Sequence, residues 1–291
     1  MTTLFVKHLT VIDFSYLHTT LGIVGESLIV DIAIKGALDD QGMILDFGDA
    51  KKILKKKIDA SIDHTLVIPT LSPYLEISTH KEQTMLSFDF GRHTLNLTSP
   101  NTSLFQITEQ EITPETIEKT LETLLIPLLP EYASSLSIRA YPETTQGAYY
   151  HYTHGLKKHY GNCQRIAHGH RSRIEIWQNN QRAFHFEQEW SRLLNARFLG
   201  SQENITQILK RSSESYFQFS YQAPQGFFEL TLPESSCYLM ETETTVEFIA
   251  EHIAQKLSER YPQDYIEVQA YEGVNKGAIA ITESNLATYP D

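Results

Sequence analysis

Three histidines and one cysteine lie close together near the middle of the chain. His154 precedes Cys163 by nine residues, and His168 and His170 follow it with a single residue between them. The residues after His170 alternate between polar and apolar types, which predicts a half-buried strand with both of these histidines on one face. Three neutral imidazoles beside an open coordination position are the usual ligands of a catalytic zinc ion. The cluster therefore predicts a zinc site, with His154 supplied by a neighbouring element.

Ordinary polar packing is the competing interpretation of this cluster. The chain has 12 histidines, and a His-x-His pair by itself is more often structural than metal-binding. A third histidine and one of only two cysteines within the same 17 residues favour the metal site. His151 and His159 are near enough in the sequence to replace His154. The spacing thus predicts a metal site but leaves its third ligand open.

The composition excludes several classes of protein. A net charge of -12 argues against general nucleic-acid binding, which needs a basic surface. The longest apolar stretch, 124–129, is interrupted by a proline and is far shorter than the roughly 20 residues of a membrane-spanning helix. The N-terminus lacks the pattern of a signal peptide, and two cysteines are too few for a disulfide framework. These features indicate a cytoplasmic protein with neither a membrane nor a nucleic acid as partner.

Two groups of basic residues stand out from the acidic background. The first is expected to form a solvated helix face and comprises Lys51, Lys52, Lys55, Lys56 and Lys57. The second surrounds the histidine cluster and comprises Lys157, Lys158, Arg165, Arg171 and Arg173. Because such cations bind phosphate groups, the second group predicts a polyanionic substrate.

The chain contains a weak internal repeat. Residues 139–148 resemble residues 269–278, and each segment follows a helical pattern and a strand-like run. Thr113, which precedes a proline, predicts the start of a helix in the first copy, while Thr244 and Glu247 have the spacing of a capping box in the second. Apolar stripes at helical spacing follow both starts: Ile117, Leu121, Leu124, Leu125 and Leu128, and then Val246, Ile249, Ala250, Ile253 and Leu257.

The strand patterns extend this repeat over the length of 291 residues. The expected pairs are 4–14 with 28–35, and 148–153 with 171–178. Each half then has two strands, a helix, two middle strands, a second helix and a closing strand. This order predicts an α+β fold of two modules, 1–147 and 148–291, each with an antiparallel sheet and helices on one face. Because such sheets have open edges, we expect the modules to assemble into a barrel and the chain to form a homo-oligomer.

Several motifs outside the histidine cluster carry a family resemblance. The first is the run Gly42-Met43-Ile44-Leu45-Asp46-Phe47-Gly48-Asp49-Ala50-Lys51-Lys52, followed by Ile62-Asp63-His64. The others are Cys163 followed by His-Gly-His, and the terminal run from Glu272 to Gly277-Ala278. Together they resemble the 6-pyruvoyl-tetrahydropterin synthase and 6-carboxytetrahydropterin synthase family, over most of the chain but as two incomplete copies. The resemblance implies tandem tunnelling-fold (T-fold) modules, zinc held by three histidines, and a substrate derived from dihydroneopterin triphosphate.

The resemblance also assigns roles to individual residues. The zinc ligands correspond to His154, His168 and His170. Cys163 corresponds to the catalytic thiol, and Asp63 and His64 correspond to the pair that works with it as general acid and base.

The residues that hold the pterin are implied in the same way. Glu272, or its repeat counterpart Glu143, corresponds to the acid that anchors the pterin ring, where one carboxylate can accept two hydrogen bonds from adjacent donors. Thr244 and Thr245 correspond to positions that help to hold the pterin, with helix capping as the alternative role.

The two copies depart from the family pattern in complementary ways. The first keeps His18 but has Val24-Gly25-Glu26 in place of His-Gly-His, and no cysteine precedes it. The second keeps the metal and thiol motifs but shows no Asp-His pair, and its middle, 184–238, has no clear match and is a candidate for substrate specificity. The simplest hypothesis is complementation, in which a degenerate first module lends Asp63 and His64 to the site of the second.

The implied activity is that of a zinc-dependent lyase. It would convert 7,8-dihydroneopterin triphosphate to 6-carboxytetrahydropterin with loss of acetaldehyde and triphosphate, as in queuosine and deazapurine biosynthesis. A reaction like that of 6-pyruvoyl-tetrahydropterin synthase or of a pterin aldolase is an alternative use of the same residues. A protein that binds a pterin or purine without turnover is a further alternative. The presence of the thiol, the Asp-His pair and three histidines in one chain favours an enzyme.

Overall fold

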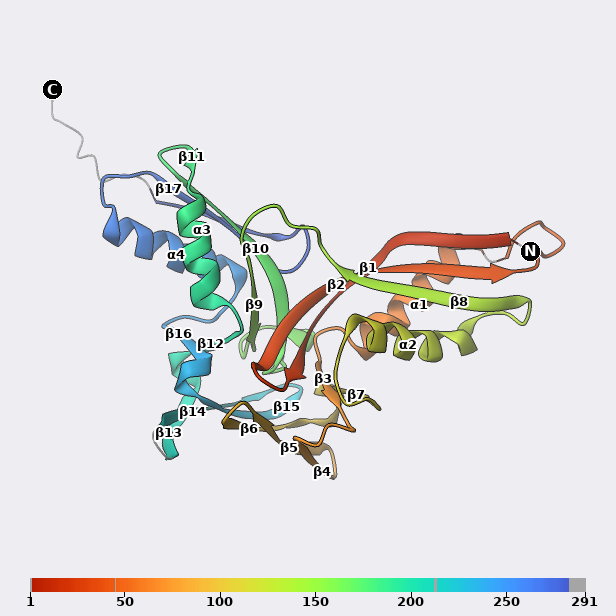
Figure 1. Cartoon of the computed structure of the whole chain (residues 1–291), viewed down its shortest axis with the longest axis horizontal. Helices are drawn as coiled ribbons and strands as arrows, with labels where there is room; N and C mark the ends of the chain where they lie inside the picture. The colour runs from red at the N-terminus through yellow and green to blue at the C-terminus, as the bar shows by residue number, and fades with distance from the viewer. Residues whose placement is uncertain (1, 45, 212–213, 283–291) are drawn as a thin grey trace.

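The computed structural model describes residues 2–44, 46–211 and 214–282, and it consists of two similar halves that share a third sheet (Figure 1). Each half contains a pair of adjacent antiparallel strands with two helices on one face of its sheet. The architecture is α+β with two modules in tandem, as the repeat predicted, and it is the tandem T-fold that the family resemblance implied. None of the helices that the model describes is long and apolar enough to cross a membrane.

The first half is built on a five-stranded sheet with the order β7-β3-β1-β2-β8. Its elements are β1 (Thr2–His18), β2 (Gly22–Gly36), α1 (Phe47–Ser61), β3 (Leu66–Pro69), β7 (Leu104–Ile107), α2 (Pro114–Leu125) and β8 (Ala133–Pro142). The antiparallel pairing of β1 with β2 confirms the predicted strand pair. Parallel strands β3 and β7 extend the sheet at one edge. Buried residues of both helices, including Leu54 of α1 and Leu121 of α2, form one core with β1, β2 and β8.

The second half repeats this arrangement with the strand order β16-β12-β9-β10-β17-β18. Its elements are β9 (Tyr149–His154), β10 (His168–Gln178), β11 (Gln181–Arg182), α3 (Phe184–Leu194), β12 (Arg197–Ser201), β16 (Cys237–Met240), α4 (Val246–Arg260), β17 (Ile266–Tyr271) and β18 (Gly277–Thr282). The pairing of β9 with β10 is again as predicted. The apolar stripe of α4 is buried against α3 and the sheet, so α3 and α4 correspond to α1 and α2.

A third sheet joins the halves and was not predicted. Its strands are β4 (Leu75–His80), β5 (Gln83–Phe90), β6 (His93–Pro100), β13 (Ile205–Arg211), β14 (Glu214–Ala223) and β15 (Gly226–Pro233). The order β13-β14-β15-β6-β5-β4 reads symmetrically about the β15–β6 pair. Each half therefore has five middle strands rather than the two predicted, because three antiparallel strands are inserted between the short parallel ones. Because the strands of this sheet come from both halves, the division of the chain into independent modules, 1–147 and 148–291, stays a prediction.

Segment 184–238, for which the sequence showed no clear match, has a structural counterpart in the first half. This segment supplies α3, β12 and the strands β13 to β16, which match α1, β3 and β4 to β7 in order and pairing. The match was hidden because the two segments share backbone topology and an apolar face, not a residue motif. Whether this segment determines substrate specificity stays a prediction.

The helix caps agree with the sequence in one half and differ by one residue in the other. Thr113 caps α2, since its hydroxyl accepts a hydrogen bond from the N–H of Thr116 at 3.3 Å. In α4 the cap is Thr245, whose hydroxyl accepts from the N–H of Phe248 at 3.4 Å, and not Thr244 as the capping-box spacing predicted. The reason is that Thr244 is buried with its carbonyl and hydroxyl turned toward His154.

The halves meet where β2 crosses the ends of β9 and β10. Gly25 of β2 lies so close to the backbone of Tyr152 and His170 that a Cβ atom at this position would collide with both. A Cβ atom on Gly169 would in turn collide with Tyr152 and Ser15. Glycine in both His-Gly-His-like motifs is thus required for close packing of the two halves, which explains its presence in the degenerate copy.

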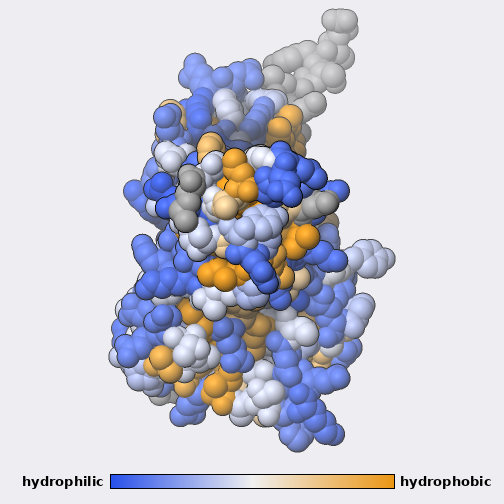
Figure 2. All heavy atoms as spheres, turned by 90° about the vertical axis from the view of Figure 1, so that its right-hand side faces the viewer, coloured by the Kyte–Doolittle hydropathy of each residue, from blue (hydrophilic) through white to orange (hydrophobic). Residues whose placement is uncertain are grey.

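The first basic group lies on the surface. Its five lysines belong to α1 and are exposed, as predicted. The side of the molecule that carries the end of the first half is largely hydrophilic, with hydrophobic residues scattered between (Figure 2). These lysines therefore do not contribute to the histidine cluster, which lies where the two halves meet.

Candidate functional site

The three histidines predicted as zinc ligands meet at one end of the second sheet. His154 ends β9 and lies directly opposite His168, the first residue of β10, while His170 follows on the same face of β10. One ring nitrogen from each histidine lies within 4.8 Å of the others, and none of the three residues is more than 1% exposed. Among the described residues this group includes neither His151 nor His159. The geometry thus identifies His154, rather than His151 or His159, as the third histidine of the cluster.

The protonation of this triad suits a metal ion. The Nδ1–H groups of His154 and His168 donate to the carbonyls of Thr244 and Arg165, each at 2.8 Å, which leaves the Nε2 lone pairs free. In the described part of the chain, the buried Nε2 of His154 and both ring nitrogens of His170 have no hydrogen-bond partner. Burial, reinforced by the neighbouring histidines, holds the pKa values of His154 and His168 well below the usual range. Neutral imidazoles with unpaired nitrogens are ligands that fit zinc.

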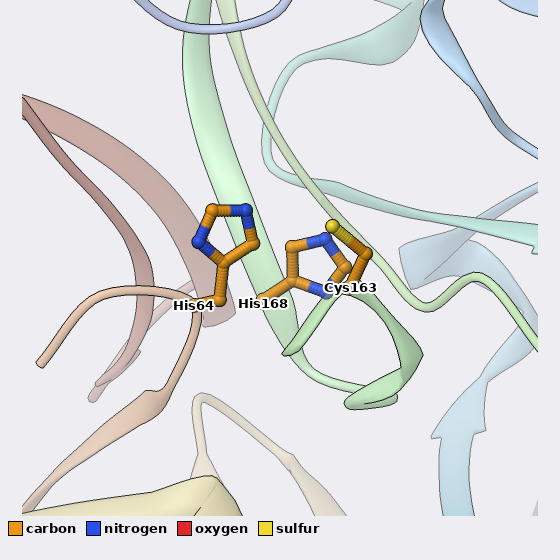
Figure 3. A group of neighbouring side chains, drawn as sticks. All are labelled: His64, Cys163 and His168. Atoms are coloured by element: carbon orange, nitrogen blue, oxygen red, sulfur yellow. The ribbon is translucent and has the colours of Figure 1, made fainter. Parts of the chain in front are cut away.

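Cys163 lies beside the triad on a short turn, η3 (Gly161–Gln164), between β9 and β10. Its sulfur and one ring nitrogen each of His64 and His168 lie within 4.8 Å of one another. Figure 3 shows these three side chains converging from three separate segments. The thiol is therefore in contact with both the predicted metal site and the predicted acid-base residue.

The first half supplies Asp63 and His64 to this cluster from the turn after α1. Asp63 Oδ1 accepts from the N–H of Asp13 at 2.9 Å, and Asp63 Oδ2 lies 2.7 Å from Nδ1 of His64. The N–H of His64 donates to the carbonyl of Asp13 at 2.6 Å, and the residue has a positive φ of 54°. Its ring stacks on that of His168 with centroids 5.1 Å apart. The structure thus brings the pair to the thiol within a single chain, as complementation requires.

The environment of His64 favours its imidazolium form. Burial opposes the charge, but hydrogen bonds to Asp63 and Cys163 outweigh burial and raise the pKa of His64 to about 10. A proton is therefore available at this ring near neutral pH, next to a thiol that can exchange it.

This pKa gives a direct test of the pairing. We expect the His64 ring to stay protonated at pH 8 in the zinc-free protein, and Asp63→Asn to lower its pKa, as measured by NMR titration of the histidine rings. Because the folded-state pKa is raised, the charge stabilises the fold fully below about pH 6.5, the unfolded value. That contribution is lost as the pH rises toward 10. The stability difference between the wild type and His64→Ala should shrink over this interval, and a constant difference would contradict the pairing.

Arg165, predicted to contact a triphosphate, has another role in the structure. It is only 8% exposed, and its guanidinium donates to the carbonyls of Asp63 and His64 at 3.4 and 3.2 Å. Its own carbonyl accepts from His168. Arg165 thus ties the thiol loop to the Asp-His turn through Nη1, and its contact with a triphosphate stays a prediction.

The remaining cations of the second basic group are also paired. Arg171 lies 3.9 Å over the ring of Tyr149 and donates to the carbonyl of Glu143, and Arg173 pairs with the carboxylate of Glu143 at 3.0 Å. Two partly exposed lysines, Lys157 and Lys158, share Glu203. These two lysines remain as surface candidates for the triphosphate.

The two acids predicted to anchor the pterin lie in different surroundings. Glu272 is half-buried beside the triad, with Oε1 3.9 Å from Nε2 of His170 and Oε2 3.7 Å from Nζ of Lys276. Glu143 is bound instead by Arg173, away from the three histidines. Geometry therefore favours Glu272 of the two.

Thr244 and Thr245 both make hydrogen bonds within the protein. Thr245 caps α4, which is the alternative role named for it, and Thr244 fixes the ring of His154 through its carbonyl. Contact of either threonine with a pterin stays a prediction.

Two charged residues of the site were missed by sequence reasoning. Asp13 of β1 is buried with Oδ1 3.4 Å from Nδ1 of His170, and Lys276 lies 3.1 Å from the other carboxylate oxygen of Asp13. Lys276 falls within the repeated motif that contains Glu272, which was the one signal available. Nothing in the sequence near Asp13 points to the histidines, because the contact joins residues of different halves.

The first half contains the counterpart of this site without its chemical groups. The residues in the places of the triad are Tyr16, Val24 and Glu26, because Tyr16 lies opposite Val24 as His154 lies opposite His168. His18, which the sequence suggested for this place, lies two residues further along β1, opposite Gly22. Nδ1 of His18 accepts hydrogen bonds from the N–H groups of Thr20 and Leu21, so it caps a turn. Burial raises the pKa of Glu26 to about 7. A tyrosine, an apolar residue and a carboxylic acid do not form a zinc site.

The Asp-His turn also has a counterpart, at Asn195 and Ala196. Ala196 has the same positive φ of 54° as His64. The side-chain oxygen of Asn195 accepts from the N–H of His151 at 3.0 Å, as Asp63 does from Asp13. The repeat has therefore kept the backbone of this turn in both halves, while only the first half has the charged side chains.

Comparison with known proteins agrees with this two-fold organisation. A family model described as 6-pyruvoyl tetrahydropterin synthase matches residues 22–125 and again residues 143–283. No curated protein sequence matches the chain.

Similar solved structures have the same description. A 6-pyruvoyltetrahydropterin synthase of Plasmodium vivax, a mutant of a catalytic residue, is 17% identical with a TM-score of 0.38, and the alignment covers 48% of this chain and 97% of that one. The enzyme of Plasmodium falciparum is 16% identical with a TM-score of 0.37 and the same coverage.

Proposed function

Because the chain belongs to the 6-pyruvoyl tetrahydropterin synthase family, we propose that it is a zinc-dependent lyase that acts on a pterin triphosphate at one composite site per chain. The observation that carries the proposal is the contact of Cys163 with His64 beside the buried triad. The thiol and triad come from the second half and His64 from the first, so neither half holds all of the groups.

The triad is the proposed zinc site, with His154, His168 and His170 as ligands. When bound there, zinc supplies Lewis acidity that makes hydroxyl groups on the substrate side chain more acidic. The carbonyls of Thr244 and Arg165 accept hydrogen bonds from Nδ1 of His154 and His168 and leave Nε2 of both rings free. These two rings are therefore already oriented for binding in the metal-free protein.

Cys163 and His64 are the proposed acid-base pair. Asp63 holds Nδ1 of His64 at 2.7 Å, which fixes the ring while its other face is turned toward the thiol and His168. A proton can then pass between the sulfur, the imidazole and the side-chain carbons of the pterin. The raised pKa of His64 keeps the donor protonated near neutral pH.

Glu272 is the proposed anchor for the pterin ring. Its carboxylate lies beside His170 and is paired only loosely, at 3.7 Å, with Lys276. Adjacent N–H donors on the ring can displace this pairing with two hydrogen bonds to one carboxylate. The predicted contacts of Thr244 and Thr245 with the pterin belong to the same proposal.

The proposed product is 6-carboxytetrahydropterin, formed from 7,8-dihydroneopterin triphosphate with loss of acetaldehyde and triphosphate. This choice follows from the resemblance of the motifs, since a 6-pyruvoyl product would use the same residues. Incubation with 7,8-dihydroneopterin triphosphate and identification of the pterin by mass tests the proposal. The 6-pyruvoyl compound would assign the other reaction, and a chain that binds zinc and the pterin without forming any product would be a binding protein.

Zinc content tests the single composite site. We expect one zinc per chain, and we expect His168→Ala to abolish high-affinity binding because it removes a buried ligand. His151→Ala is the matched control and should keep its zinc, because His151 lies outside the triad. Elemental analysis after gel filtration measures both. Two zinc ions per chain would contradict the loss of the first-half site.

The proposed assembly is a homo-oligomer. Strands β7 and β16 end their sheets in the described structure, and an uncovered edge strand offers its backbone groups to a second chain. We propose that such edges close the sheets into a barrel.

A further inference from the structure

Asp13 of the first half projects into the metal site of the second half. It is 3% exposed, and its Oδ1 lies 3.4 Å from Nδ1 of His170. Its backbone also holds the Asp-His turn, through hydrogen bonds with Asp63 and His64. One residue of β1 therefore contacts both the Asp-His turn and a proposed zinc ligand.

Groups of both halves surround this carboxylate. Nζ of Lys276 lies 3.1 Å from Oδ2, and the Ser27 hydroxyl donates to Oδ1 at 2.5 Å. Gly273 has a positive φ of 70°, and a Cβ atom there would collide with Oδ1. A buried carboxylate is destabilising unless it is paired and hydrogen-bonded, and these contacts supply both.

His170 differs from the other two ligands in what holds it. His154 and His168 donate from Nδ1 to backbone carbonyls of their own half. Nδ1 of His170 makes no such hydrogen bond to any residue that the structure describes, and the carboxylate of Asp13 lies 3.4 Å from it. A carboxylate at this position fixes the tautomer of a ligating histidine and makes the ligand more basic, which strengthens metal binding.

We propose that Asp13 is a positioning residue for the metal centre, which orients His170 with Nε2 toward the ion. The inference rests on the proposed zinc site and extends it, because the first half then contributes to metal affinity as well as to proton transfer. Lys276 serves as the counter-ion of Asp13 and keeps the loop that carries Glu272 in place.

Asp13→Asn in the full-length chain tests this role. The substitution keeps the size of the side chain and removes its charge. In the metal-free protein, titrated with Zn²⁺ against a coloured chelator, we expect affinity to fall about 10- to 100-fold. With Co²⁺ as the probe, the visible spectrum should change, since the orientation of one ligand changes. A thermal unfolding scan confirms that the variant is folded.

Asp31→Asn is the matched control. Asp31 is 5% exposed and is paired with Lys7 at 2.8 Å, but its charged and polar partners, Lys7, His8 and Tyr141, belong to the first half and not to the triad. We expect its loss to lower stability and to leave zinc affinity unchanged. Equal zinc losses in the two variants would overturn the proposal, because they would reflect general destabilisation.

Two further variants keep the test decisive if Asp13→Asn does not fold. Ser27→Ala removes the hydroxyl that donates to Oδ1 and also accepts from the N–H of Arg171, and a smaller loss of zinc affinity than in Asp13→Asn is expected. Lys276→Met removes a cation near the metal and should leave affinity unchanged or improve it. Unchanged affinity in Ser27→Ala would overturn the role of Asp13, as would a loss in Lys276→Met that equals or exceeds that of Ser27→Ala. A wild-type chain that binds no zinc would instead refute the proposed metal site.

Discussion

Replacing Cys163 with alanine should abolish turnover of 7,8-dihydroneopterin triphosphate while zinc stays bound. The sulfur lies with His64 and His168 at the meeting point of the two halves, and it is not among the three proposed zinc ligands. Loss of a positioned acid-base group lowers kcat by about 10²- to 10⁴-fold. Steady-state kinetics and zinc content of the same preparation measure the two effects separately.

The second cysteine is the control for this experiment. Cys237 belongs to β16, its sulfur contacts the carbonyl of Pro233, and burial raises the pKa of its thiol. Cys237→Ala should therefore keep kcat within a few-fold of the wild type. If Cys163→Ala turned over at the wild-type rate, the thiol would have no part in the mechanism.

His64→Ala should lower kcat by a similar factor, about 10²- to 10⁴-fold, although the substitution lies in the half without a metal site. The reason is that His64, whose pKa is raised to about 10, is the proposed proton donor next to Cys163. The fold should tolerate the change, because Ala196 occupies the counterpart position in the second half with the same φ of 54°. His18→Ala in the same half is the control and should be fully active.

Mixing the two inactive variants distinguishes a site within one chain from a site between chains. In the structure His64 and Cys163 meet within one chain, so Cys163→Ala and His64→Ala chains should remain inactive when mixed or refolded together. Recovery of activity would show that the halves of different chains meet in the assembly. Full activity of His64→Ala alone would reduce the first half to a structural role.

The two copies of the repeat share the backbone of the Asp-His turn but differ in its side chains, and the hydrogen bonds that fix this turn explain the difference. The turn at Asn195 and Ala196 and the turn at Asp63 and His64 share a backbone conformation because each is fixed by a side-chain oxygen that accepts from a neighbouring strand. An asparagine can make that bond as well as an aspartate, so the fold does not require the charge. The chemistry could therefore be lost from one copy while the architecture of both was kept.

Local pattern was enough to identify the elements that carry the site. The two strand pairs, the cap at Thr113 and the buried stripe of α4 were predicted correctly, because alternation and helical spacing report directly on which side of an element is buried. The third sheet was missed, since its strands pair across the two halves and no local signal specifies their partners.

The sequence by itself determined the chemical types at the site: a triad of histidines, one thiol and one Asp-His pair within a repeated fold. Only the tertiary structure decided which of them meet. It selected His154 over its neighbours, placed Glu272 rather than Glu143 beside the triad, turned Arg165 inward, and added Asp13 and Lys276. The physical reason is the sequence separation over which each kind of contact acts. Spacing of two to four residues fixes the side of a strand or helix, whereas contacts between residues about a hundred positions apart depend on how whole sheets pack.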